Sequence, residues 1–163
     1  MTNKEILVLN KVLRGCLRLT GVKFAYATVR NLKLLAPIVE GLEKAIDFGY
    51  DYRQYDKARE EICKKYCERD EKDKPVIVND VYQFNEDNRH KFDSAVMALN
   101  EEPEHKAAIE ARKLQEAEYL GLLDIVPEDM PKLHKIKIEN VPEGITGKEL
   151  MILTDHGIVT EEQ

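Results

Sequence analysis

The stretch that decides the fold runs from residue 22 to residue 70 and reads VKFAYATVRNLKLLAPIVEGLEKAIDFGYDYRQYDKAREEICKKYCERD. Its apolar residues recur at intervals of three and four, which is the spacing of a helix that packs on other helices. They are Leu32, Leu35, Val39, Leu42 and Ile46, followed by the weaker continuation Tyr55, Ile62 and Tyr66. The pattern predicts one long helix over 22–70, about 70 Å long at a rise of about 1.5 Å per residue.

Two features of this stretch bend or break such a helix. Pro37 removes the amide that would donate to the Lys33 carbonyl, so a kink is expected there. Gly41 and Gly49 each weaken the helix by up to about 1 kcal/mol relative to alanine. The sequence therefore predicts one long kinked helix, and a true break near Pro37 or Gly49 is the structural alternative.

Shorter helices are predicted on both sides of this stretch. Thr2 or Asn3 can cap a first helix that ends at 20–21, because such side chains accept hydrogen bonds from first-turn amides. This helix would pack back on the long one as an antiparallel hairpin. Further helices are expected in two pieces over 85–119 and as a short closing helix over 146–153.

A small sheet is predicted from three β-rich runs. Residues 76–78 and 81–84 flank the pair Asn79–Asp80, which is typical of a tight β-hairpin. Residues 133–138 alternate apolar and polar side chains, so they are expected to form the third strand of this antiparallel sheet. The chain from Asp155 on is expected to fray.

These segments predict a mainly α protein with a small β-sheet, of the α+β class. A length of 163 residues suits a single domain, with a long helical hairpin over 1–70 and a smaller α+β portion over 71–163. No apolar run is long enough to cross a membrane, and the N-terminal residues lack the pattern of a secretory signal. The cytoplasm is therefore the predicted location.

The net charge of −6 hides a strong asymmetry along the chain. Residues 1–35 carry seven basic side chains and one acidic side chain, whereas residues 36–163 carry 18 basic and 30 acidic side chains. The basic end suggests contacts with an anion, and the alternatives are a solvated helix face or ion pairs with the acidic remainder. The overall acidity argues against general nucleic-acid binding. The candidate anion contacts are Lys11, Arg14, Arg18 and Arg30.

Aromatic side chains gather in the middle of the predicted long helix. One helix cannot bury all of them on a single stripe, and Tyr and Arg are enriched where protein partners dock. The alternative is that they pack against the chain's own hairpin. The candidate partner-binding residues are Phe48, Tyr50, Tyr52, Arg53 and Tyr55.

The motifs of common enzymes are incomplete in this chain. The string 144–149, GITGKE, resembles a phosphate-binding loop but lacks its first glycine and the hydroxyl that would bind magnesium. Ser94 is the sole serine and lies in no motif, which leaves a serine triad without support. Three cysteines suggest reduced thiols, and Cys63 and Cys67 have no companion histidines at metal-ligand spacing. We expect no catalytic residue, no cofactor and no metal site.

The layout resembles a family of small proteins of unknown function encoded by tailed phages and prophages. The resemblance covers residues 22–32, VKFAYATVRNL, and residues 60–70, EEICKKYCERD, followed by a polar turn and a hairpin. It also covers the late run 133–138, which leads through 140–142, NVP, to a short helix. The resemblance implies a phage context and an accessory role, and it carries over no catalytic residue.

The first functional hypothesis is therefore a non-enzymatic, phage-encoded interaction protein that self-associates or docks on a protein partner, as a virion or assembly accessory. Its location would be the cytoplasm of a bacterial host or the virion itself. The alternative is a phage inhibitor of a host defence nuclease, whose acidic surface would occupy the nucleic-acid channel. A third hypothesis is an enzyme that uses Asp155 and His156, or the cysteine pair. A membrane partner is not expected, and no small-molecule substrate is indicated.

Overall fold

The computed structural model describes residues 1–161, and contacts within the chain divide it into two compact units. The first unit contains residues 1–46 and the chain from residue 118 on, and the second contains residues 47–117. This division does not decide whether the chain is one domain, so the single domain with portions 1–70 and 71–163 stays a prediction.

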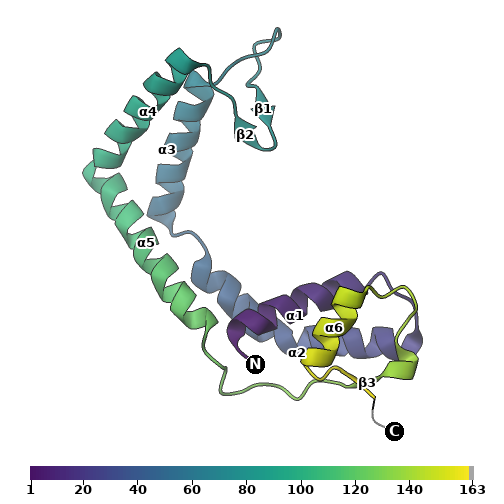
Figure 1. The fold of residues 1–163 in the computed structure, drawn as a ribbon. Coiled ribbons are helices and arrows are strands. Elements are labelled where there is room, and N and C mark those ends of the chain that lie inside the picture. The colour runs from purple at the N-terminus through teal and green to yellow at the C-terminus, as the bar shows by residue number, and fades with distance from the viewer. Residues whose placement is uncertain (162–163) are drawn as a thin grey trace. The chain divides into compact units, whose positions relative to one another are not determined.

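The chain is mainly α-helical with a small amount of β-structure, which confirms the predicted fold class (Figure 1). The helices are α1 (Asn3–Cys16), α2 (Val22–Ile46), α3 (Tyr50–Tyr66), α4 (Glu86–Glu101), α5 (Pro103–Leu123) and α6 (Gly147–Asp155). The strands are β1 (Ile77–Val78), β2 (Val81–Tyr82), β3 (Ile136–Lys137) and β4 (Val159–Thr160), with one 3-10 turn at Ile138–Asn140.

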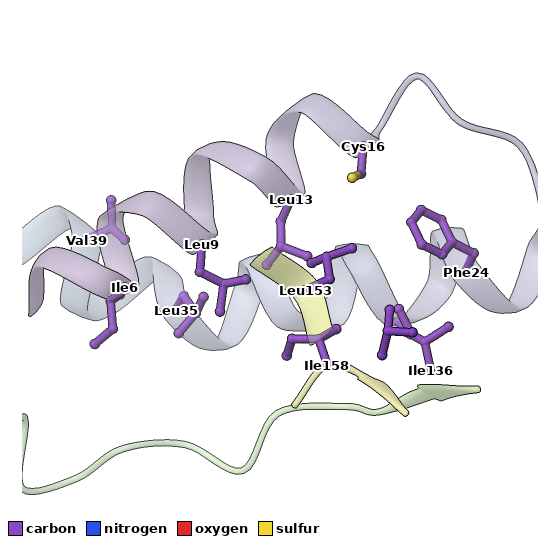
Figure 2. Packing of buried hydrophobic residues seen from close by; sticks show 12 residues of the cluster. Ile6, Leu9, Leu13, Cys16, Phe24, Leu35, Val39, Ile136, Leu153 and Ile158 are labelled. Atoms are coloured by element: carbon purple, nitrogen blue, oxygen red, sulfur yellow. The ribbon is translucent and has the colours of Figure 1, made fainter. Parts of the chain in front are cut away.

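The predicted hairpin of the first helix and the start of the second is confirmed. Thr2 caps α1, since its hydroxyl accepts the Glu5 amide while the Glu5 carboxylate accepts the Thr2 amide. The apolar stripe of α1 then packs on α2 and on the C-terminal part of the first unit. Figure 2 shows Leu9 and Leu13 gathered with Leu35 of α2, together with Leu153 of α6.

A buried amide ties the late part of the chain to α2. Asn31 is fully buried, and its side chain makes two hydrogen bonds with the backbone of His134. Nδ2 donates to the His134 carbonyl over 2.9 Å, and Oδ1 accepts the His134 amide over 2.7 Å. Because this pair of bonds fixes the chain just before β3, it brings Ile136 into the core.

The prediction of one continuous helix over 22–70 is wrong, and the break lies next to Gly49, which was the structural alternative. Pro37 stays inside α2 on its exposed side, where water can replace the lost hydrogen-bond donor. After Ile46 the chain is held in a turn. The Asp47 carboxylate accepts the Phe48 amide over 2.9 Å, and Arg53 Nε donates to the Phe48 carbonyl over 2.7 Å.

The late strand does not join the predicted hairpin. Its short β3 pairs in parallel with β4, with Ile136 opposite Val159 and Lys137 opposite Thr160. The expectation of a frayed end is also wrong as far as the described residues go, because Ile158 and Val159 are almost completely buried. These two apolar residues fill the core beside α6, and their burial stabilises the pairing of β3 with β4.

The predicted tight hairpin is confirmed in the second unit. Asn79 and Asp80 have φ values of 50° and 62°, the left-handed pair that a type I′ turn requires. Ile77 lies opposite Tyr82, and Val78 lies opposite Val81. Among the described residues this two-stranded sheet gains no third strand, which leaves its apolar side chains only partly covered.

The two units differ sharply in how much apolar surface they bury. The first unit holds the continuous core that surrounds Leu9, Leu35 and Leu153. In the second unit α3 packs on α4, and the buried apolar side chains of its 71 positions are Tyr55, Cys67, Leu99 and Ala108. None of the described helices is long and apolar enough to cross a bilayer.

Replacing Leu35 by alanine should lower the free energy of unfolding by about 2–5 kcal/mol, because a fully buried leucine leaves a cavity behind. Urea unfolding followed by circular dichroism measures this change. The matched control is Leu120→Ala, since Leu120 is 64% exposed and its loss should change the free energy by about 0.5 kcal/mol or less. Equal losses for the two variants would contradict the described core.

Candidate functional site

The aromatic residues around the helix break form a row of contacting rings within the second unit. Phe48 lies 5.2 Å from Tyr52, and Tyr52 lies 5.5 Å from Tyr55, measured between ring centroids. The row ends at His105 of α5, 5.7 Å from Tyr55. At its other end the Arg112 guanidinium lies 4.4 Å above the Phe48 ring, a cation–π contact that joins α5 to the turn before α3.

The side chains of Tyr55 and Tyr52 therefore make contacts within the second unit. Tyr55 is 7% exposed, and its hydroxyl donates to Asn100 Oδ1 of α4 over 2.9 Å. Burial raises the pKa of the Tyr55 hydroxyl, in keeping with a neutral hydrogen-bonding role. Tyr52 is half-buried. These two residues therefore pack within their own unit, but against α4 and α5 and not against the hairpin that the alternative named.

The other three candidate partner-binding residues remain accessible. Tyr50 is 75% exposed and Phe48 is 42% exposed, so both present aromatic surface to solvent. Arg53 is exposed but engaged, since it donates to the Phe48 carbonyl and pairs with Asp47 over 3.2 Å. That these residues bind a partner stays a prediction. Tyr50 is the strongest candidate of the three because its ring is the most exposed.

A groove of about 510 Å³ lies beside Tyr50, between the start of α3 and one face of α5. On α5 the small residues Ala107, Ala108 and Ala111 line it. Three carboxylates line it, those of Asp47, Asp51 and Glu104. Arg112 lines it as well, and the Asp47 carboxylate pairs with Arg53. The groove therefore combines apolar side chains with the carboxylates of Asp51 and Glu104, and it can accept a segment that is apolar on one side and basic at its edge.

This groove was missed in the sequence, although a signal for it existed. Glu104, Ala107, Ala108 and Ala111 follow the three-and-four spacing of one helix face. What the spacing did not reveal was that the chain breaks before α3 and so brings Asp51 and Tyr50 opposite this face.

The candidate anion contacts divide into two groups. Lys11, Arg14 and Arg30 are exposed and form no ion pair with any side chain that the structure describes. Arg18 instead pairs with Glu149 of α6 through two bonds, Nη1 to Oε1 over 2.7 Å and Nη2 to Oε2 over 2.8 Å. For Arg18 the structure thus supports the alternative of an ion pair with the acidic remainder.

Glu149 has two tasks at once. Besides holding Arg18, it completes the capping box of α6, because Oε2 accepts the Thr146 amide over 2.9 Å. The Arg18 hydrogen bond and the Thr146 amide together lower the pKa of the Glu149 carboxyl to about 2. The pair therefore links the end of α1 to the start of α6 and keeps Glu149 charged.

A second hollow of about 490 Å³ lies between α3, the β1–β2 hairpin and α4. Phe84 and Phe92 stack in its wall with ring centroids 4.7 Å apart, and Arg89 lies 5.5 Å above the Phe84 ring. Cys63 also lines it, but burial raises the pKa of its thiol, which disfavours the nucleophilic thiolate. All three cysteines are free.

One group of side chains has the composition of a metal site. The ligand atoms of Glu102, Glu104 and His105 lie within 4.8 Å of one another at the start of α5. The two carboxylates are exposed, and acidic residues at a helix start stabilise the helix dipole without any ion. This cluster carries no metal assignment.

The residues of the third hypothesis lie at the end of α6. Asp155 is its last residue and is exposed, and His156 follows as the C-terminal cap.

Comparison of the whole chain with known proteins finds no matching family model, no matching curated protein and no matching solved structure.

Replacing Glu149 by glutamine should make the free energy of unfolding depend less on pH in the acid range. The folded-state pKa lies below the ordinary glutamate value, so the stabilisation is fully present above that value and is lost as the pH falls toward about 2. The free energy of unfolding, measured by urea titration across this range, should fall less steeply in Glu149→Gln than in wild type. Glu143→Gln is the control on the exposed surface, and an unchanged profile in Glu149→Gln would refute the role of the pair.

Replacing Tyr55 by phenylalanine should lower the free energy of unfolding by about 0.5–1.5 kcal/mol, because it removes the hydroxyl bond to Asn100 and keeps the ring contacts. Tyr50→Phe, at an exposed position, should leave the free energy unchanged. Urea unfolding of both variants measures the difference, and equal values would argue against a stabilising hydrogen bond between Tyr55 and Asn100.

Proposed function

We propose that the chain is a non-enzymatic interaction protein that docks on a protein partner, a second copy of itself included, through the unit formed by residues 47–117. We further propose that it is phage-encoded and serves as a virion or assembly accessory in a bacterial host. The phage context is supported by the sequence resemblance alone. The docking role is supported by the physical character of the second unit.

The observation that carries the docking role is the small core of this unit. Four buried apolar side chains are few for 71 residues, because folding must offset about 1–2 kcal/mol of backbone entropy for each ordered residue. The same unit leaves apolar side chains at its surface, with Ile77 50%, Val78 51% and Val81 60% exposed on the hairpin. Contact with a partner would cover this surface and supply the missing burial.

Tyr50 provides a suitable anchor for such a contact. Tyrosine combines a large apolar ring with a hydrogen-bonding hydroxyl and few rotatable bonds, and it is enriched among the residues that dominate binding energy. In this chain the ring borders the groove on α5 and is the most exposed aromatic side chain of the second unit.

The carboxylates of this unit support a second candidate function, an inhibitor of a host defence nuclease. Asp51 and Glu104 border the groove and have no ion-pair partner among the described residues. Such an acidic surface would compete with DNA for a basic channel, and its affinity would fall steeply with salt. A salt-insensitive complex with the partner would exclude this alternative.

The direct test is light scattering coupled to size-exclusion chromatography, on the full chain at several protein concentrations and at low and high salt. We expect a species larger than the monomer whose population grows with concentration, or capture of a defined partner by the immobilised chain. A strict monomer under all conditions that captures nothing would contradict the proposed function.

Replacing Tyr50 by serine should weaken the association about tenfold, the equivalent of about 1.4 kcal/mol, and leave the melting temperature unchanged. The melting temperature should hold because the ring is 75% exposed and makes no core contact. Sedimentation equilibrium measures the association, and Leu120→Ser serves as a control of similar exposure outside the second unit. Unchanged association in Tyr50→Ser would remove Tyr50 from the docking surface.

A further inference from the structure

One face of α2 is largely exposed within the first unit, although the Tyr26 ring on it meets the edge of the His134 ring with 6.3 Å between the ring centroids. On α2, the side opposite the core carries Val22, Tyr26 and Val29, which are 88%, 62% and 40% exposed. These residues are spaced by four and three, so they form a stripe along about two turns of the helix. Arg30 and Lys33 continue the stripe, and both are exposed without an ion-pair partner in the part of the chain that the structure describes.

This face complements two carboxylates of the groove in the second unit. Residues 22–33 contain no acidic side chain. The groove contains the guanidinium of Arg112 and the Asp47 carboxylate that pairs with Arg53, but Asp51 and Glu104 in its lining have no ion-pair partner among the described residues. The exposed apolar stripe of α2 likewise corresponds to the small apolar side chains of α5 that line the groove.

The lining of the groove on α5 suits a helix in particular. Ala107, Ala108 and Ala111 lie at helical spacing, and such small side chains allow the axis of a second helix to approach closely. A basic amphipathic helix laid in an apolar groove with acidic borders is a common mode of recognition, with anchors at every third and fourth residue. Val22, Tyr26 and Val29 have this spacing.

We propose that the exposed face of α2 in one copy of the chain docks into the α3–α5 groove of a second copy. This inference rests on the proposed function and names the two surfaces by which the chain would associate with itself. The two surfaces are different, so the contact is head-to-tail, and repetition would give a closed ring or a filament. The occupant is a second copy because the complementary basic apolar helix is present on this chain.

Charge reversal tests the pairing of the two surfaces. Arg30→Glu with Lys33→Glu makes the helix face acidic, and Asp51→Lys with Glu104→Lys makes the groove basic. Each double variant alone should lose the concentration-dependent association seen for wild type in sedimentation equilibrium, because like charges would then face each other. An equimolar mixture of the two should regain association, since each contains a surface that complements the other.

Controls keep the result specific. Lys11→Glu with Arg14→Glu reverses the same charges on the exposed side of α1, and Glu128→Lys with Glu143→Lys does so for exposed acids of the first unit. Both controls should associate as wild type does. Since Asp51 and Glu104 lie in first turns of helices, the milder pair Asp51→Asn with Glu104→Gln provides a second groove variant, and circular dichroism verifies that all variants are folded.

The outcomes separate this inference from the proposed function. Wild-type association that persists in both reversed variants, or that a mixture of folded variants does not restore, overturns the α2–groove contact while docking by another surface stands. A wild type that stays monomeric but captures a different protein also overturns the contact. Restored association in the mixture, with both controls unaffected, supports it.

Discussion

The packing of α1 along α2 is the interaction on which the rest of the structure depends. Leu9 and Leu13 meet Leu35 and form the surface on which α6 and the β3–β4 pair settle. Two polar contacts then fix the late segment: the Asn31 amide holds the backbone before β3, and Arg18 holds Glu149 at the start of α6. Segments more than a hundred residues apart in the chain thus share one core.

The second unit has no comparable core, and this contrast carries the functional argument. Its helices are joined by a row of aromatic rings and by the Tyr55–Asn100 bond, with little aliphatic packing beneath them. Apolar side chains that the unit cannot cover itself are available to a partner. The exposed face of α2 carries Arg30 and Lys33, and the groove on α5 carries the carboxylates of Asp51 and Glu104, which is why self-association is the form of docking we propose.

Local elements of the fold could be predicted from the sequence because short-range chemistry determines them. The Asn79–Asp80 turn and the Thr2 cap of the first helix depend on residues within a few positions of one another. The pairing of β3 could not be predicted in this way. It depends on the burial of Ile158 and Val159 by helices from the other end of the chain.

The break between α2 and α3 could not be placed from local sequence either, because it depends on packing. Pro37 carried the stronger breaking signal, yet the packing of Leu35 and Val39 keeps α2 continuous through it. The chain breaks instead at Asp47 and Phe48, where the apolar stripe weakens and Arg53 holds the turn. The candidate aromatic residues were found by composition, but which of them stay accessible depended on this turn, and the groove beside Tyr50 exists only because of it.

Hydrogen exchange followed by mass spectrometry tests the central claim most directly, because it reports the protection of each segment in the intact chain. The claim is that the first unit is complete by itself and the second is completed by docking. At low protein concentration the amides of α3 and α4 should exchange much faster than those of α1 and α2, and they should slow as the chain associates or as a partner is added. Equal protection of the two units, unchanged by concentration and by any partner, would contradict it.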